Sequence, residues 1–205
     1  MAKLLSVEEA LAIALEPVNY VGDERVDLLS ALGRVIAEDI YAPLDIPLEA
    51  NSAMDGYAVR AEDVASASIE SPVVLTVVED LPAGYVARKS LGQGEAIRIM
   101  TGAPIPDGAD AVVMVEVTER VEDNRVKIFE SAKVGQSIRP RGEDVHAGDL
   151  LIKRGSELGS AEIGLLASCQ RPFVLVARRP TVAIISTGDE LVEIEQPLMA
   201  GKIVN

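Results

Sequence analysis

The middle of the chain, from Ser71 to Phe129, consists of short apolar runs separated by clusters of glycine, proline and aspartate. Short runs rich in β-branched residues favour strands, and the turn-forming clusters between them exclude long helices. We therefore expect a small β barrel or sandwich, with Asp123 and Asn124 turning a hairpin because asparagine tolerates the left-handed conformation. The apolar runs are Val73 to Val78, Ala96 to Met100, Ala111 to Val117 and Val126 to Phe129.

Helical patterns flank this β-rich stretch on both sides. Ser6 and Glu9 have the spacing of a capping box, and apolar residues then recur at helical spacing. Ser160 is expected to cap a second helix before Pro172. The apolar faces of the two helices contain Val7 and Leu11 in the first and Ile163 and Leu166 in the second.

The pattern near the C-terminus is that of a parallel sheet. Phe173 to Ala177 and Thr181 to Ile185 are expected to form strands, and the second has the continuous β-branched run of a strand buried on both faces. The loop from Ser186 to Glu190 then lies where α/β proteins bind ligands at strand ends. Only fifteen residues follow Glu190, which is too few to complete a doubly wound sheet. We therefore expect this region to be the start of such a domain.

Charge and composition argue against two classes of partner. The net charge of −14 opposes the phosphate contacts that nucleic-acid binding requires, so no nucleic acid is expected. No apolar run approaches the ~20 residues of a membrane span, and Met1 to Ser6 lacks the apolar core of a secretory signal. The single cysteine, Cys169, has no partner for an internal disulfide. These features predict a cytoplasmic protein without membrane contact.

Acidic residues in polar loops offer hard oxygen ligands of the kind that Mg²⁺ prefers. Taken alone, each of them is better explained as a turn or cap residue than as a metal ligand. The acidic candidates are Asp55, Asp144, Asp189 and Glu190, and the four polar loops are Asn51 to Tyr57, Met100 to Gly108, Arg139 to Asp144 and Ser186 to Glu190.

Arg139 and Arg141 present forked donors that match phosphate and other oxyanions. Their neighbours Glu143 and Asp144 offer an alternative, a surface network of ion pairs. The fingerprints of Rossmann dehydrogenases, P-loop NTPases, zinc sites and α/β-hydrolases are absent from the sequence. The residue types by themselves therefore leave the reaction open.

Five segments, in order along the whole chain, together resemble one family, the molybdopterin molybdotransferases, which include MoeA and the E domain of gephyrin. One such segment would carry little weight, whereas five in the family's order form a specific signal. The matching segments are Pro43 to Pro47, Asn51 to Val59, Arg98 to Pro104, Arg141 to Asp144 and Ser186 to Leu191.

The resemblance implies a multi-domain α+β fold. A split α/β domain, residues 1–48 and 139–178, carries an inserted β-rich, barrel-like domain, residues 49–138. Residues 179–205 are then the truncated start of a doubly wound, molybdopterin-binding α/β domain. An elongated homodimer is also implied, in which the loops around Asp55 and Glu190 meet across the two-fold interface. We expect the apolar faces of both helices to form much of that interface.

The family's activity is the Mg²⁺-dependent insertion of molybdate into adenylylated molybdopterin with release of AMP. The resemblance implies the same activity here, with a molybdopterin-adenylylating protein as the upstream partner. By motif match, the expected catalytic residues are Asp55, Thr101, Asp144 and Glu190, of which Asp55 and Glu190 are also the expected metal ligands. The residues expected to bind molybdopterin are Ser52, Arg139, Arg141, Thr187, Gly188 and Asp189.

The resemblance covers the N-terminal half of the family, so we expect this chain to be inactive alone. Two alternatives remain open. The first is a non-catalytic scaffold or dimerisation module of the same family. The second is a metal-dependent phosphohydrolase, which is less favoured because no histidine accompanies the carboxylates.

Overall fold

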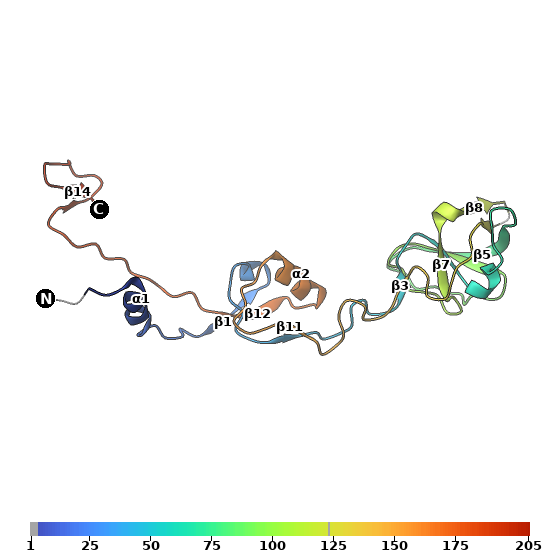
Figure 1. Cartoon of the computed structure of the whole chain (residues 1–205), viewed down its shortest axis with the longest axis horizontal. Helices are drawn as coiled ribbons and strands as arrows, with labels where there is room; N and C mark the ends of the chain where they lie inside the picture. Colours follow the sequence, from blue (N-terminus) through green and yellow to red (C-terminus); the bar gives the residue numbers. More distant parts are fainter. Residues whose placement is uncertain (1–3, 123) are drawn as a thin grey trace.

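The computed structural model describes residues 4–122 and 124–205, which are mostly β and contain two α-helices. The molecule is elongated, with a six-stranded sheet at one end and a smaller central unit that two extended segments separate from it (Figure 1). The helix α1 (Val7–Leu15) and the strand β14 (Ile203–Val204) lie toward the other end. No helix among the described residues is both long and apolar enough to cross a membrane.

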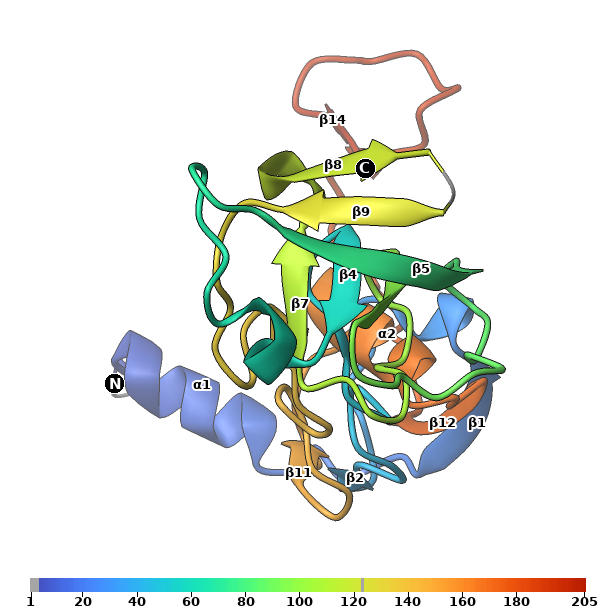
Figure 2. The ribbon, with the colours of Figure 1, turned by 90° about the vertical axis from the view of Figure 1, so that its right-hand side faces the viewer.

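The six-stranded sheet confirms the predicted barrel-like β region in the form of a curled half-barrel. Its strand order is β7-β4-β6-β5-β9-β8, and β5 and β6 are its parallel pair. Figure 2 shows β5, β9 and β8 crossing steeply over β4 and β7, which is the curl of the sheet. Its elements are β4 (Gly56–Val59), η2 (Ala61–Val64), β5 (Val73–Leu81), β6 (Glu95–Ile99), β7 (Ala111–Met114), η3 (Val115–Val117), β8 (Thr118–Val121) and β9 (Arg125–Ile128).

The predicted hairpin joins β8 to β9, which pair antiparallel from Thr118–Ile128 to Val121–Arg125. Asn124 in the turn has a φ of 54°, the left-handed conformation that asparagine tolerates. Its neighbour Asp123 lies outside the described residues.

Alternate residues of the interior strand β4 enter two different hydrophobic cores. Tyr57 and Val59 pack on one side of the sheet, and Ala58 packs on the other with Ile97 and Ile99. This alternation follows from the two-residue period of a strand. Since β4 and β6 are antiparallel, the start of β4 and the end of β6 lie at the same edge.

The central unit contains the antiparallel pair of β1 (Asp23–Asp27) and β12 (Phe173–Ala177), so the predicted strand from Phe173 to Ala177 is confirmed. The helix α2 (Ser160–Ser168) begins at Ser160, and its cap is Gly159, whose N–H donates to the Glu162 carboxylate at 2.9 Å. The unit also contains η1 (Leu29–Ala31).

The two helices differ in how they bury their apolar residues. Leu166 is fully buried in the core of the central unit, and Ile163 packs against that core. Leu166 is therefore not available to the predicted dimer contact, and the dimer itself stays a prediction. In contrast, α1 buries none of its residues, and Val7 and Leu11 are exposed. Its predicted capping box is present.

Two antiparallel segments, residues 40–52 and 138–152, connect the central unit to the sheet, and we call them the neck. The chain enters the sheet region through the first segment and returns through the second, as expected of an insertion. The domain boundaries themselves stay a prediction. The neck contains the pairs β2 (Ile40–Tyr41) with β11 (Leu150–Ile152) and β3 (Asn51–Ser52) with β10 (Ile138–Arg139), and a bridge between Ile46 and Val145.

The predicted strand from Thr181 to Ile185 is absent, because residues 178–188 form no regular element and Ile184 is 91% exposed. A strand of this composition needs neighbours on both sides, and the described residues supply none. Farther on, β13 (Leu191–Val192) pairs in parallel with β14. The doubly wound domain therefore stays a prediction.

Candidate functional site

Asp55 and Thr101 are joined directly at the sheet edge, although they lie 46 residues apart in the sequence. Asp55 directly precedes β4, and Thr101 follows β6 by two residues. The Oδ1 atom of Asp55 accepts hydrogen bonds from the backbone N–H and from the hydroxyl of Thr101, both at 2.7 Å. Both residues are exposed, so two separate loops present this pair to solvent.

The hydrogen bonds from Thr101 favour the ionised form of Asp55. The Thr101 backbone N–H, followed by its hydroxyl, holds the pKa of the Asp55 carboxyl below its usual range, and the charge of Arg98 adds to this effect. Asp55 is therefore a carboxylate at neutral pH. Because both hydrogen bonds from Thr101 engage Oδ1, Oδ2 is the oxygen left to meet a ligand.

Ser52 shapes the loop that carries Asp55. Its side chain is fully buried, and its hydroxyl donates to the carbonyl oxygen of Met54 at 2.5 Å. Backbone bonds from Ser52 N–H to Ala103 and from Gly102 N–H to Ser52 join this loop to the loop after Thr101. Ser52, which we predicted as a substrate contact, thus faces inward and holds the two loops together.

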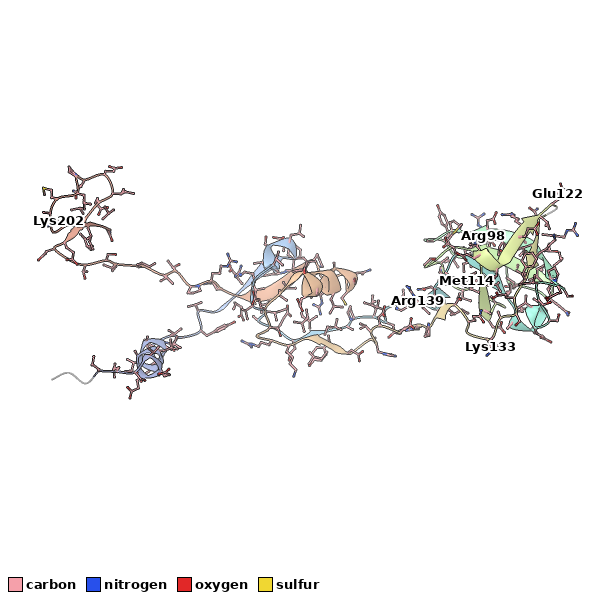
Figure 3. All side chains as sticks on the ribbon, turned by 45° about the horizontal axis from the view of Figure 1, so that its top comes forward. Arg98, Met114, Glu122, Lys133, Arg139 and Lys202 are labelled. Atoms are coloured by element: carbon pink, nitrogen blue, oxygen red, sulfur yellow. The ribbon has the colours of Figure 1, made fainter. Side chains whose placement is uncertain are left out.

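Arg139 in β10 is directly opposite Asn51 in β3, four residues before Asp55. The side chain of Arg139 is exposed, and no described residue forms an ion pair with it. Figure 3 shows Arg139 on the side of the sheet that faces the neck. The guanidinium of Arg139 therefore lies near the Asp55 loop and can bind an anion there.

Arg141 has a partner that sequence reasoning missed. Its Nε donates to the carboxylate of Asp45, which also accepts the backbone N–H of Ala147 at 2.7 Å. The alternative of a network with Glu143 and Asp144 is therefore wrong for Arg141. Asp144 is exposed on the neck, and its N–H donates to the Ile46 carbonyl at 2.9 Å.

Asp45 is expected to make the stability of the neck depend on pH. The Ala147 N–H, followed by Arg141, holds the pKa of Asp45 below its usual value, which is about 3.9. A carboxyl with a lowered folded-state pKa stabilises the protein above its unfolded pKa, and this contribution is lost as the pH falls through the folded pKa. We therefore expect Asp45→Asn to lower the melting temperature at neutral pH and to have little effect near the acid limit.

Scanning calorimetry of the wild type and Asp45→Asn, from neutral pH down to a pH below the folded-state pKa of Asp45, checks this expectation. Asp80→Asn is the matched control, since Asp80 forms an exposed ion pair with Arg120 on the sheet and such pairs contribute little. An equal loss of stability at both pH extremes would contradict a role for the charge of Asp45.

The loop from Thr187 to Glu190 lies far from Asp55 within the chain. All four of its residues are exposed, and a Cβ on Gly188 would lie 2.4 Å from Glu190 Oε2, so that carboxylate folds over Gly188. Lys202 Nζ donates to the Asp189 carbonyl. Figure 3 shows Lys202 at the opposite end of the molecule from Arg139. One chain therefore does not bring Asp55 and Glu190 together.

The residues of one chain do not fit the predicted Mg²⁺ site. In residues 4–122 and 124–205, no three His, Cys, Asp or Glu side chains are grouped in a way that would hold a metal ion. A cation bound by Asp55 and Glu190 together would need these residues from two different chains.

A cavity of about 310 Å³ lies beside the Asp55–Thr101 pair. One of its walls is Gly102, the residue after Thr101, and another is Asn51, whose buried Oδ1 has no hydrogen-bond partner among the described residues. An unpartnered buried acceptor is unusual and calls for a donor from water or a ligand. The lining residues are Pro47, Leu48, Glu49, Asn51, Gly102 and Pro104.

Comparison with known proteins identifies the family. Residues 5–169 match the model of the MoeA N-terminal region (domain I and II), and the chain belongs to this family. The family resemblance noted from the five motifs is therefore confirmed.

Relatives and solved structures agree with this assignment. A molybdopterin molybdenumtransferase of Nostoc sp. is 50% identical over 182 residues, covering 89% of this chain and 42% of the relative. That of Bacillus subtilis is 45% identical, covering 98% of this chain and 47% of the relative. The crystal structure of the molybdopterin biosynthesis moeA protein from Pyrococcus horikoshii OT3 superposes with a TM-score of 0.88 at 40% identity, covering 98% of this chain and 54% of that one. The chain spans about half the length of these relatives.

Proposed function

We propose that this chain supplies Asp55, Thr101 and Arg139 to a molybdopterin molybdotransferase. The reaction is the insertion of molybdate into adenylylated molybdopterin with release of AMP. The observation that carries this proposal is the ionised Asp55 carboxylate, bonded twice to Thr101 at a solvent-facing edge in a chain of the MoeA family. The cavity beside this pair supports the proposal, because it offers space for part of a substrate.

The charges of the site suit the chemistry of the proposed substrates. Molybdate and the phosphate groups of adenylylated molybdopterin are anions, and the guanidinium of Arg139 is suited to bind their oxygens. The carboxylate of Asp55 repels such anions unless a cation lies between them, which agrees with a requirement for Mg²⁺. We infer that Glu190 of a second chain completes the cation site, with Asp144, Thr187, Gly188 and Asp189 as further contacts to substrate.

The proposed function includes a homodimer. Asp55 and Glu190 lie at opposite ends of one chain, and the apolar residues Val7 and Leu11 of α1 are uncovered. We expect light scattering to give about twice the monomer mass of 21.7 kDa, and Leu11→Lys to reduce the dimer fraction because it buries a charge in the contact. A strictly monomeric wild type at high concentration would contradict the shared site. Val74→Lys, an exposed apolar residue on the sheet, is the control.

The substrate also implies an upstream partner. Because the substrate is adenylylated, a protein that adenylylates molybdopterin must act first, and we infer a cytoplasmic location for both steps. No chemistry on nucleic acid or at a membrane is part of this proposal.

A second candidate function is a non-catalytic scaffold of the same family. The observation that favours it is the separation of the Asp55 and Glu190 loops within the chain. Isothermal calorimetry of the chain with molybdopterin, AMP and molybdate, each with and without Mg²⁺, distinguishes the two candidates. Mg²⁺-dependent binding that Asp55→Ala removes supports the enzyme. Absence of all binding supports the scaffold.

A further inference from the structure

The Asp55–Thr101 pair lies beyond the last paired residues of β4 and β6. Pairing between these strands ends with Gly56 opposite Ile99, and both members of the pair come from the loops outside it. The ladder of backbone hydrogen bonds therefore does not by itself fix the distance between the two loops. Backbone hydrogen bonds from Ser52 to Ala103 and from Gly102 to Ser52 join the two loops farther out, and a contact at the strand ends themselves would add to them.

Arg98 makes such a contact. Its Nη1 donates to the carbonyl oxygen of Gly56, the residue after Asp55, at 2.7 Å, and reaches the Ile99 carbonyl at 3.4 Å. Its Cζ lies 5.2 Å from the centroid of the Tyr57 ring, and that ring is buried. Met114 pairs with Gly56 from the other side of β4.

These contacts restrict Arg98 strongly. A hydrogen bond from a charged donor is shorter and stronger than a neutral one, and a planar guanidinium over an aromatic ring gains a further attraction. Arg98 belongs to β6, whereas Gly56 and Tyr57 belong to β4. The side chain thus clamps the first residue of β4 to the strand that leads into Thr101.

We propose that Arg98 is a positioning residue for the Asp55–Thr101 pair, which it holds together by clamping Gly56 against the end of β6. The geometric role stands on the contacts alone, and its importance for the reaction rests on the proposed function. A role in the stability of the whole sheet has a different consequence. Because β4 pairs with β6 and β7 on both sides, loss of Arg98 is expected to loosen the strand end and leave the sheet intact.

Nuclear magnetic resonance of this chain tests the role directly. The Thr101 amide donates to a carboxylate at 2.7 Å, so its proton is expected to resonate far downfield. In Arg98→Met, we expect this resonance to move upfield and its solvent exchange to become about tenfold faster, with the amides of β5 and β9 unchanged. Arg98→Lys keeps the charge and a donor, and should restore part of the signal. Arg120→Met, which removes an exposed guanidinium paired with Asp80 on the same sheet, should leave Thr101 unchanged.

An unchanged Thr101 signal in Arg98→Met would overturn the proposal. An equal loss of protection throughout the sheet would also overturn it, because Arg98 would then be a general structural crosslink. A second arm measures molybdoenzyme maturation by a full-length protein, in which Arg98→Met should lower the yield at least tenfold and Arg98→Lys should restore part of it.

The two arms separate this proposal from the proposed function. If Asp55→Ala abolishes maturation and Arg98→Met does not lower it, the importance of Arg98 for the reaction is refuted. If neither variant lowers maturation while the Thr101 signal still moves, the proposed function fails and the positioning role stands.

Discussion

Replacement of Asp55 by alanine is expected to abolish cofactor formation in a full-length protein that contains this chain, while its fold stays intact. The carboxylate lies on an exposed loop outside the sheet, so its removal leaves both hydrophobic cores of the sheet untouched. It removes the one acidic group that Thr101 holds at the site. Loss of a single preorganised polar group at a reacting centre typically costs a factor of about 10² to 10³ in rate, so we expect at least that loss of molybdoenzyme maturation in cells.

Two further variants identify which property of Asp55 matters. Asp55→Asn keeps an acceptor for Thr101 and removes the charge, so it should be as defective as Asp55→Ala if the charge is required. Asp80→Ala removes an exposed carboxylate elsewhere on the same sheet and should mature molybdoenzymes normally. Wild-type maturation by Asp55→Ala would refute the proposed enzyme.

Replacement of Gly56 by alanine is expected to destabilise the sheet strongly, although it adds only one methyl group. A Cβ at this position would lie 2.0 Å from the carbonyl oxygen of Val113 and 3.1 Å from the Met114 Cα, both in the backbone of β7. A backbone atom of a paired strand has little freedom to move away. Overpacking typically costs about 1–3 kcal/mol, and we expect the upper end of that range or more in urea unfolding followed by circular dichroism.

Gly164→Ala is the matched control for this experiment. Gly164 lies inside α2, and an added Cβ would meet nothing within 4 Å. Alanine is the better helix former by about 1 kcal/mol, so this variant should be neutral or slightly stabilised. If Gly56→Ala unfolds at the wild-type urea concentration, β4 and β7 are not as close as the structure places them.

The sequence predicts the strands of the sheet well because each is a short apolar run between turn residues. Val73 to Val78 and Val126 to Phe129 correspond closely to β5 and β9. Their neighbours were not predictable, since β4 is inserted between β6 and β7 and β5 runs parallel to β6. Such pairings depend on contacts between distant segments, about which local patterns carry no information. The prediction of a strand from Thr181 to Ile185 failed for the related reason that the described residues supply no strand to pair with it.

In the candidate site, too, the sequence identified individual residues but not the contacts between residues that are distant in the chain. Loop motifs identified Asp55 and Thr101 as candidates, and their direct contact emerged only from the antiparallel pairing of β4 with β6. Arg141 was expected to bind an oxyanion, with the adjacent acidic residues as the alternative partners, whereas its partner in the structure is Asp45, which lies 96 residues away. Asp45 belongs to the first of the five family motifs and lies between two prolines. It contacts Arg141 because the two segments of the neck run antiparallel side by side.

The antiparallel pairing of β1 with β12 determines how tension on the chain would act. Asp23 is paired with Ala177 and Asp27 with Phe173, so a pull on the two flanking segments loads the Asp23–Ala177 end first. The hydrogen bonds would then open one after another, as in unzipping. Both neck segments lie inside the loop that this pair closes, so the six-stranded sheet carries no load until β1 and β12 have separated. Mechanical strain on the ends of the molecule is thus absorbed before it reaches Asp55 and Thr101.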